Sequence, residues 1–137
     1  MRNEQLKQVL DNVDIYNCEE IITNHIFYCK RKVRQRCYNE DNSYYYISGK
    51  YEFLVIAEDG EKQGIILRCD YVDLHWYVYK KWRNKGVLSN ALRTGVISRL
   101  WPENREITCC YDYNDNCMEK YNKTKHLASV AGLKLRD

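Results

Sequence analysis

The sequence predicts a single domain of the α/β (α+β) class, in which an antiparallel strand meander leads into helices and a parallel strand. Apolar residues recur at helical spacing near the N-terminus and again after residue 86. Between these patterns lie runs of β-branched and aromatic residues of strand length, separated by turn-forming residues. The 137 residues suffice for one compact domain and not for two, so residues 1–137 are expected to fold as one unit.

Residues 1–38 are expected to form a helical N-terminal part. The first helix is predicted over residues 3–13, where apolar residues recur three and four positions apart. A second helix is predicted from about Cys18 to Arg34. Acidic residues stand in its first turn and basic residues near its end, which complements the helix dipole. Its apolar stripe consists of Cys18, Ile21, Ile22, His25, Ile26, Cys29 and Val33.

A series of strands is predicted after the loop at residues 39–42. Residues 44–135 are expected to form the sheet and, as argued below, a cofactor-binding core. Asp59-Gly60 is a strong hairpin signal, because these residue types tolerate the positive φ angles of a tight turn. Ser48-Gly49 is expected to form a turn. The strands are predicted at residues 44–47, 51–57, 63–69 and 72–79.

A crossover follows the last strand of this series. Apolar residues at helical spacing predict a helix over residues 87–100, and Pro102 stops it. A strand over residues 106–111 follows the helical crossover, so we expect it to lie parallel to residues 72–79. The remaining expected elements are a helix over residues 115–131, its C-cap at Gly132 and a short strand at residues 133–135.

The loop at residues 80–86 joins a strand to a helix and carries four Lys or Arg residues. The first turn of a helix has unpaired N–H groups and lies at the positive end of the helix dipole. Gly86, with no side chain, allows a ligand to approach the backbone closely. We therefore expect a phosphate-bearing ligand to be held at Gly86–Ser89.

The spacing of residues from the end of the strand at 72–79, through the loop at 80–86, to the start of the following helix resembles motif A of the GNAT superfamily, the acyl-CoA N-acyltransferases. Arg83 and Gly86 meet its Q/R-x-x-G-x-G/A core, whereas Leu88 stands where a small residue is usual. The matching residues are Val78, Trp82, Arg83, Lys85, Gly86, Val87 and Leu92.

The C-terminal part resembles the same superfamily. Its order of meander, crossover helix, parallel strand, helix and short strand is similar to the superfamily order over about Tyr51–Leu135. No strand is predicted before the first helix and none after residue 135, so the resemblance implies a sheet truncated at both ends. The residues similar to the branch that resembles ribosomal-protein acetyltransferases are Thr124, Leu127, Ala128, Gly132 and Leu133.

The resemblance implies an acetyl-CoA-dependent N-acetyltransferase, which transfers an acetyl group to an amine of a protein or a small molecule. It implies a GNAT-like mixed sheet whose parallel strand, residues 106–111, splays from residues 72–79 and admits the pantetheine arm. Backbone groups around residues 77–79 would bind that arm, and the loop with the helix start would bind the pyrophosphate. The implied cofactor-binding residues are Tyr77, Val78, Tyr79, Arg83, Asn84, Lys85, Gly86, Val87, Leu88, Ser89 and Thr124.

Acyl transfer to an amine requires a group that removes a proton, and a donor for the leaving thiolate assists it. Asp73 and His75 share one face of their strand by alternation, so either is a candidate base. In the superfamily the frequent acid is a Tyr at the place that Ala128 holds here. Tyr121 is the leading candidate for the proton donor, and Tyr111 and Tyr113 are alternatives.

Composition sets further expectations. No run of 18 or more apolar residues occurs, so no membrane association is expected. The polar N-terminus lacks an apolar signal region, which indicates a cytoplasmic protein. The seven cysteines have irregular spacing and no C-x-x-C pair, so we expect reduced, mostly buried thiols and no metal site.

Two other functions remain open. The first is a non-catalytic GNAT-fold module that binds CoA or acts through protein contacts, which Leu88 and Ala128 favour. The second is a nucleic-acid-directed modifier that uses the basic cluster at residues 30–36 with exposed aromatic side chains. The net charge of +3 is too small to indicate nucleic acid by itself. An unpaired sheet edge near residue 135 would allow a homodimer.

Overall fold

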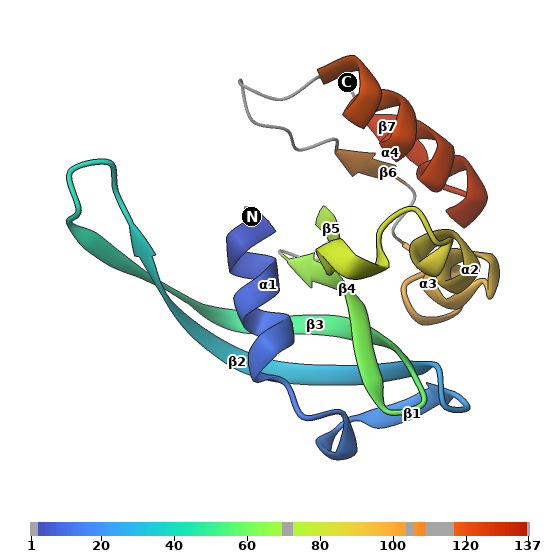
Figure 1. Ribbon diagram of the computed structural model, residues 1–137, viewed down its shortest axis with the longest axis horizontal. Helices are drawn as coiled ribbons and strands as arrows, with labels where there is room; N and C mark the ends of the chain where they lie inside the picture. Colours follow the sequence, from blue (N-terminus) through green and yellow to red (C-terminus); the bar gives the residue numbers. More distant parts are fainter. Residues whose placement is uncertain (1–2, 70–72, 104–105, 109–116, 137) are drawn as a thin grey trace.

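The computed structural model describes residues 3–69, 73–103, 106–108 and 117–136. It describes the side chains of these residues except those of 31–35, 47–50, 69, 73, 106–108, 117–121 and 135–136. The fold is mixed α and β (Figure 1). The helices are α1 (Asn3–Asn12), η1 (Ile15–Asn17), η2 (Lys80–Trp82), α2 (Val87–Arg93), α3 (Val96–Leu100) and α4 (Cys117–Ala131). The strands are β1 (Glu19–Ile22), β2 (Ile26–Tyr38), β3 (Tyr44–Glu58), β4 (Glu61–Cys69), β5 (Asp73–Val78), β6 (Glu106–Thr108) and β7 (Lys134–Arg136).

The main sheet contains five antiparallel strands in the order β1-β2-β3-β4-β5, so each strand pairs with the next one along the chain. This confirms the predicted antiparallel meander. The tight turn between β3 and β4 is also confirmed: Asp59 and Gly60 have φ angles of 51° and 80°. In these left-handed conformations a two-residue loop matches the twist of the two strands.

The predicted helix over residues 18–34 is wrong, because this segment forms β1 and β2. Its apolar residues fit a helical period, but they also fit strand alternation. Ile26 packs on one face of the sheet and Cys29 on the other. Asn24, with φ of 56°, makes the turn that separates the two strands, and its N–H donates to the Glu20 carboxylate. β-branched and aromatic residues around this turn favour strands. Of the expected helical N-terminal part, only the first helix is confirmed, as α1.

The positions at which two elements are interrupted differ from the prediction. The expected turn at Ser48-Gly49 is wrong, since β3 runs without interruption and Gly49 pairs with Val33 of β2. The expected helix over 87–100 is divided at Gly95, whose φ of 74° ends the α-helical path between α2 and α3. The C-terminal helix ends as predicted, with Gly132 in the left-handed conformation at φ 77°.

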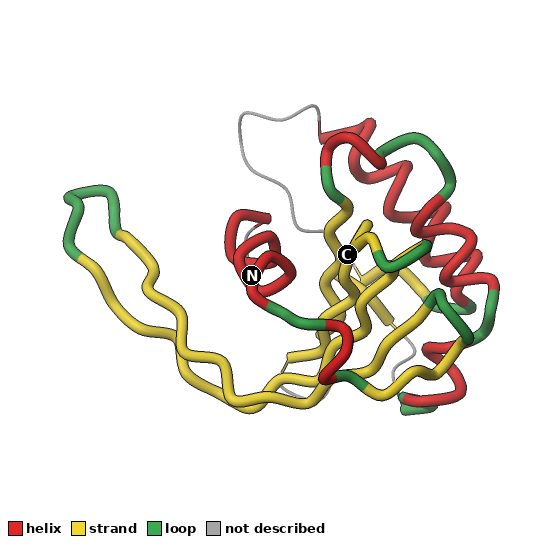
Figure 2. The backbone as a smooth tube through the Cα atoms, turned by 60° about the horizontal axis from the view of Figure 1, so that its bottom comes forward, coloured by secondary structure: helices red, strands yellow, loops and turns green. Residues whose placement is uncertain are grey.

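The sheet has a helical layer on each face (Figures 1 and 2). On one face, α1 contributes Leu6, Val9 and Leu10 to a core with alternate residues of the strands; we call this the N-terminal core. On the other face, α2, α3 and α4 pack on the intervening strand residues in a C-terminal core. Because both faces are covered, β3 reads as the continuous apolar run at residues 53–57.

The C-terminal strands form a second sheet. β6 and β7 pair in parallel, and α4 connects them. β5 and β6 are in contact, but no hydrogen-bonded pairing joins them among the described residues. The main sheet is thus antiparallel throughout. The predicted parallel partner of residues 72–79 pairs instead with β7 over residues 106–108, and residues 109–111 lie outside the described part of the chain.

α1 is fixed to the sheet by polar contacts at its C-terminal end. The Lys62 ammonium group donates to the carbonyl oxygens of Leu10, Asp11 and Val13, at 2.6, 3.1 and 2.9 Å. Burial lowers the pKa of this ammonium group. The Tyr79 hydroxyl donates to the Asp11 carboxylate at 2.5 Å, and burial together with this bond raises the pKa of Tyr79. Lys62 of β4 and Tyr79, the residue after β5, therefore both hold the helix in place.

A disulfide bond joins Cys18 to Cys29, across the β1–β2 hairpin. The expectation of reduced thiols is wrong for this pair. The two Cα atoms are 5.1 Å apart, because antiparallel pairing brings the start of β1 against β2. No helix of the described residues is long and apolar enough to cross a membrane.

Replacing Cys18 by Ser is expected to lower the free energy of unfolding by about 2–3 kcal/mol, because the bond closes a short loop in the unfolded chain. Urea unfolding of wild type and variant, each with and without reductant, measures this difference. Reductant should lower the stability of wild type to that of the variant. Equal stability of wild type with and without reductant would show that this bond does not form.

Candidate functional site

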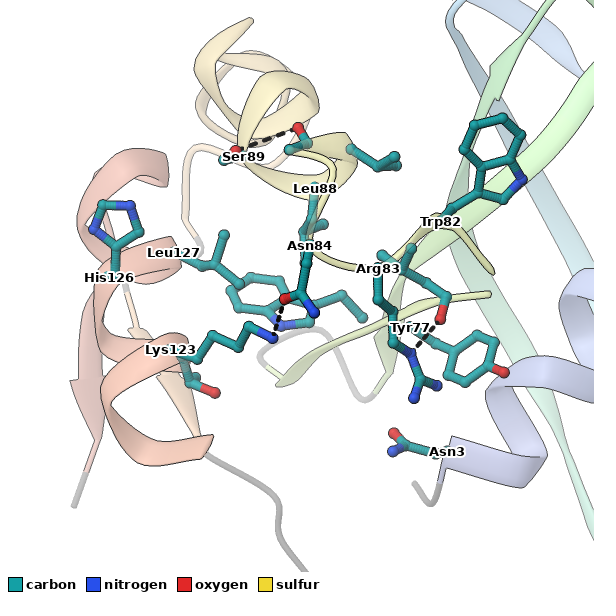
Figure 3. Close-up of a pocket in the computed structure, with 15 residues that line it drawn as sticks. Asn3, Tyr77, Trp82, Arg83, Asn84, Leu88, Ser89, Lys123, His126 and Leu127 are labelled. Atoms are coloured by element: carbon teal, nitrogen blue, oxygen red, sulfur yellow. Dashed lines mark hydrogen bonds between the residues drawn. The ribbon is translucent and has the colours of Figure 1, made fainter. Parts of the chain in front are cut away.

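A cleft of about 430 Å³ lies where the end of β5, the loop at residues 80–86, α2 and α4 meet (Figure 3). Nine of the eleven residues predicted to bind the cofactor line it. β5 and α2 bring most of these residues together because the short loop between them reverses the chain. The nine residues are Tyr77, Val78, Arg83, Asn84, Gly86, Val87, Leu88, Ser89 and Thr124.

The other two predicted residues lie outside the lining. The Tyr79 side chain packs against the N-terminal core next to Tyr77, and its hydroxyl contacts Asp11 of α1. The Lys85 ammonium group lies 5.3 Å from the centre of the Trp82 ring, and Lys81 lies 5.4 Å from the same ring. The indole ring thus holds two of the loop cations by cation–π contact.

The loop has a conformation that its sequence favours. Asn84 and Gly86 have φ angles of 61° and 77°, in the left-handed region that Asn and Gly tolerate best. Arg83 Nε donates to the Val78 carbonyl at 2.9 Å, and its guanidinium carbon lies 5.3 Å from the centre of the Tyr77 ring. These contacts fix the Arg83 charge beside the cleft.

Sequence reasoning missed six lining residues, of which two lie beside or within the predicted stretch and four come from the distant helices α1 and α4. Lys123 of α4 donates to the Asn84 side-chain oxygen at 2.9 Å, across 39 positions of sequence. Figure 3 shows this bond bridging the two walls of the cleft. Helical spacing around the predicted Thr124 was the available signal for its neighbours on α4. The missed residues are Asn3, Trp76, Trp82, Lys123, His126 and Leu127.

The charges of the cleft have one sign. Arg83 and Lys123 line it together with the imidazole of His126, and no Asp or Glu occurs among its lining residues in the described chain. Trp76, Val78 and Leu127 supply apolar surface. The Trp82 indole N–H is buried without a hydrogen-bond partner among the described groups, and Figure 3 shows that it points away from Asn84 and Lys123. An anion with an apolar portion therefore suits this cleft.

Two features restrict what the helix start contributes. α2 has only seven residues because the chain turns at Gly95, so its dipole is small. The Leu88 side chain, which is 8% exposed, packs in the C-terminal core while also lining the cleft beside the helix start. The charged side chains, rather than the helix alone, make the cleft suitable for an anion.

The predicted catalytic residues do not meet in this cleft. His75 lies on β5, half-buried, on the same strand face as Tyr77, and it is not among the lining residues. The side chains of Asp73 and Tyr121 lie outside the described set, as do Tyr111 and Tyr113 altogether. Their catalytic roles stay predictions.

Ala128 is 1% exposed in the C-terminal core. A search of the described residues for three or more His, Cys, Asp or Glu side chains able to hold a metal ion finds no such group. Comparison of the chain with protein-family models, curated proteins and solved structures gives no match.

Proposed function

We propose that the cleft binds acetyl-CoA and that the protein transfers the acetyl group to an amine of a protein or a small molecule. The observation that carries this proposal is the lining of the cleft, with two fixed cations, no carboxylate and an apolar wall among its described residues. The GNAT-like stretch at residues 77–89 forms most of that lining. The phosphates would lie near Arg83, Gly86 and Lys123.

The edge of β5 supports the position of the pantetheine arm. β4 pairs with one side of β5, and β6 contacts the other side without a shared ladder in the described residues. Backbone groups of an edge strand are available to an extended ligand. The splayed, GNAT-like arrangement of residues 72–79 and 106–111 belongs to this proposal.

The chain would assist the reaction from β5 and from α4. Acetyl-CoA supplies an activated thioester. His75 lies three residues before Val78, about 10 Å along β5 at the usual strand rise. It is therefore farther than Val78 from the loop that would hold the phosphates. There we propose that His75, with Asp73, removes a proton from the acceptor amine, and that Tyr121 donates a proton to the departing thiolate.

Acetyl-CoA is expected to bind with at least about tenfold higher affinity than S-acetylpantetheine, which lacks the phosphates that the two cations would contact. Isothermal titration calorimetry of both ligands measures this difference. Lys123→Gln should weaken only acetyl-CoA, and Lys125→Gln is the matched control, since Lys125 is an exposed residue of α4 outside the cleft lining. Equal affinity for the two ligands, or no binding of either, would contradict the proposal.

A non-catalytic CoA-binding or protein-interaction module is the second candidate. The buried Ala128 favours it, because that position offers no proton donor. A screen of amines for release of CoA thiol separates the two functions: acetyl-CoA binding without thiol release with any amine would support the module. A cytoplasmic location and a homodimer belong to the enzyme proposal. The Cys18–Cys29 bond weighs against the location, because cytosolic disulfides are rare.

A further inference from the structure

The β2–β3 hairpin extends beyond both helical layers as an arm, which we define as residues 36–46 (Figures 1 and 2). Its base lies between the two cores, and its tip is a turn in which the N–H of Asn42 donates to the carbonyl of Asn39. Apart from the buried Cys37, the side chains of this arm are exposed and belong to neither core, so the exposed aromatic character of its tyrosines calls for another explanation.

Three tyrosines and one arginine share a face of the arm. Tyr38 pairs with Tyr44, and Arg36 pairs with Tyr46, so all four side chains project to one side. The three rings are 59%, 55% and 42% exposed for Tyr38, Tyr44 and Tyr46. The opposite face is turned toward α1, where Cys37 is buried and its sulfur accepts from the Gln5 side chain at 3.0 Å.

The four side chains are ordered by contacts with one another. The Arg36 guanidinium carbon lies 4.6 Å from the centre of the Tyr44 ring and 5.7 Å from that of Tyr46, and Arg36 donates to the Tyr46 hydroxyl at 3.1 Å. The Tyr38–Tyr44 and Tyr44–Tyr46 rings meet edge to face. This leaves ring surface exposed on a preformed platform.

The charge of the hairpin exceeds that of the whole protein. Residues 30–50 contain six Lys or Arg and two acidic residues, a net charge of +4, whereas the chain carries +3. The acidic pair, Glu40 and Asp41, stands at the exposed tip with polar neighbours. A polar, acidic tip opposes insertion into an anionic membrane, which leaves the side of the arm as the binding surface.

We propose that the Arg36 face of the arm binds single-stranded nucleic acid, with bases stacked on the tyrosines and a phosphate held by Arg36. Exposed aromatic rings within a basic groove or strand are the common means of binding single strands, since every base presents a π face. A duplex hides these faces, so it would bind less well. The proposal does not depend on the function of the cleft.

The test uses the full-length protein and a fluorescein-labelled 12-nucleotide RNA, with DNA of the same sequence and a matched duplex alongside. Fluorescence anisotropy should show single strands binding more tightly than the duplex, with affinity falling as salt rises. Tyr44→Ala should weaken binding about tenfold, and Tyr44→Phe should retain it. Arg36→Gln should weaken binding and flatten the salt dependence. Equal affinity for RNA and DNA would support recognition by base stacking. A preference for one of them would identify the kind of nucleic acid that the arm binds.

Matched controls locate the site. Tyr16 is 86% exposed on η1, away from the arm, so Tyr16→Ala should bind as wild type. Arg93→Gln, at an exposed cation of α2, controls for lost charge. Equal losses in Tyr16→Ala and Tyr44→Ala, competition by acetyl-CoA, or binding of phosphatidylserine vesicles without binding of oligonucleotides would each overturn the proposal.

Discussion

Gly86→Val is expected to weaken acetyl-CoA binding by at least about 10²-fold, or about 2.7 kcal/mol. Gly86 lines the cleft with φ of 77°, where a β-branched residue is strained by about 1–2 kcal/mol. An added Cβ at Gly86 would lie 3.4 Å from the Asn90 side-chain nitrogen and 3.8 Å from the Ser89 hydroxyl oxygen, so the larger side chain would crowd the start of α2 and shift the loop that carries Arg83. Calorimetric titration of the variant with acetyl-CoA measures the loss.

Gly95→Val is the matched control for this experiment. Gly95 has nearly the same backbone, with φ of 74°, and an added Cβ meets nothing within 4 Å. It lies between α2 and α3 and outside the cleft lining. Both variants should lose similar stability, but only Gly86→Val should lose ligand affinity. Wild-type affinity in Gly86→Val, or an equal loss in both, would place the ligand elsewhere.

His75→Gln is expected to slow acetyl transfer by about 10²-fold while the dissociation constant of acetyl-CoA stays nearly unchanged. Glutamine keeps the approximate size and polarity of the side chain but has no group that accepts a proton near neutral pH. Steady-state thiol release with a saturating amine gives the rate, and calorimetry gives the affinity. The comparison separates a role in proton transfer from a role in binding.

His126→Gln provides the imidazole control, since His126 lines the cleft at the phosphate end. Its replacement should change affinity more than rate. If His126→Gln slows transfer and His75→Gln does not, the base lies at the cleft and the prediction for β5 is wrong. If neither variant slows transfer, the base is water or the substrate's surroundings.

Local signals explain which parts of the fold the sequence predicts. Asp59-Gly60 and Gly132 determine their turns through backbone conformation, and the apolar stripe at residues 3–13 allows no strand of comparable length. These elements are confirmed. The apolar stripe at residues 18–34 fits both the helical period and the strand alternation. The strand forms because β2 pairs with β3 along its whole length. Such a pairing cannot be seen in one segment of sequence.

The candidate site follows the same division. Residues 77–89 are continuous in sequence, so their meeting at one cleft was predictable from the strand–loop–helix pattern. Lys123 and Asn3 reach the cleft only because α4 and α1 pack on opposite sides of the sheet, which sequence spacing does not indicate. The pairing of β6 with β7, which places residues 106–108 in a separate sheet, likewise depends on a segment distant in sequence.

The first two turns of α1 contact both the cleft and the back of the arm. Asn3 lines the cleft, and Gln5 contacts Cys37 on the face of the arm opposite to Arg36. The same short helix thus joins two surfaces that are far apart in sequence. If a ligand on the arm shifts this helix end and so changes the affinity of the cleft, a ligand in the cleft changes the affinity of the arm by the same factor, because thermodynamic linkage between two binding equilibria is reciprocal.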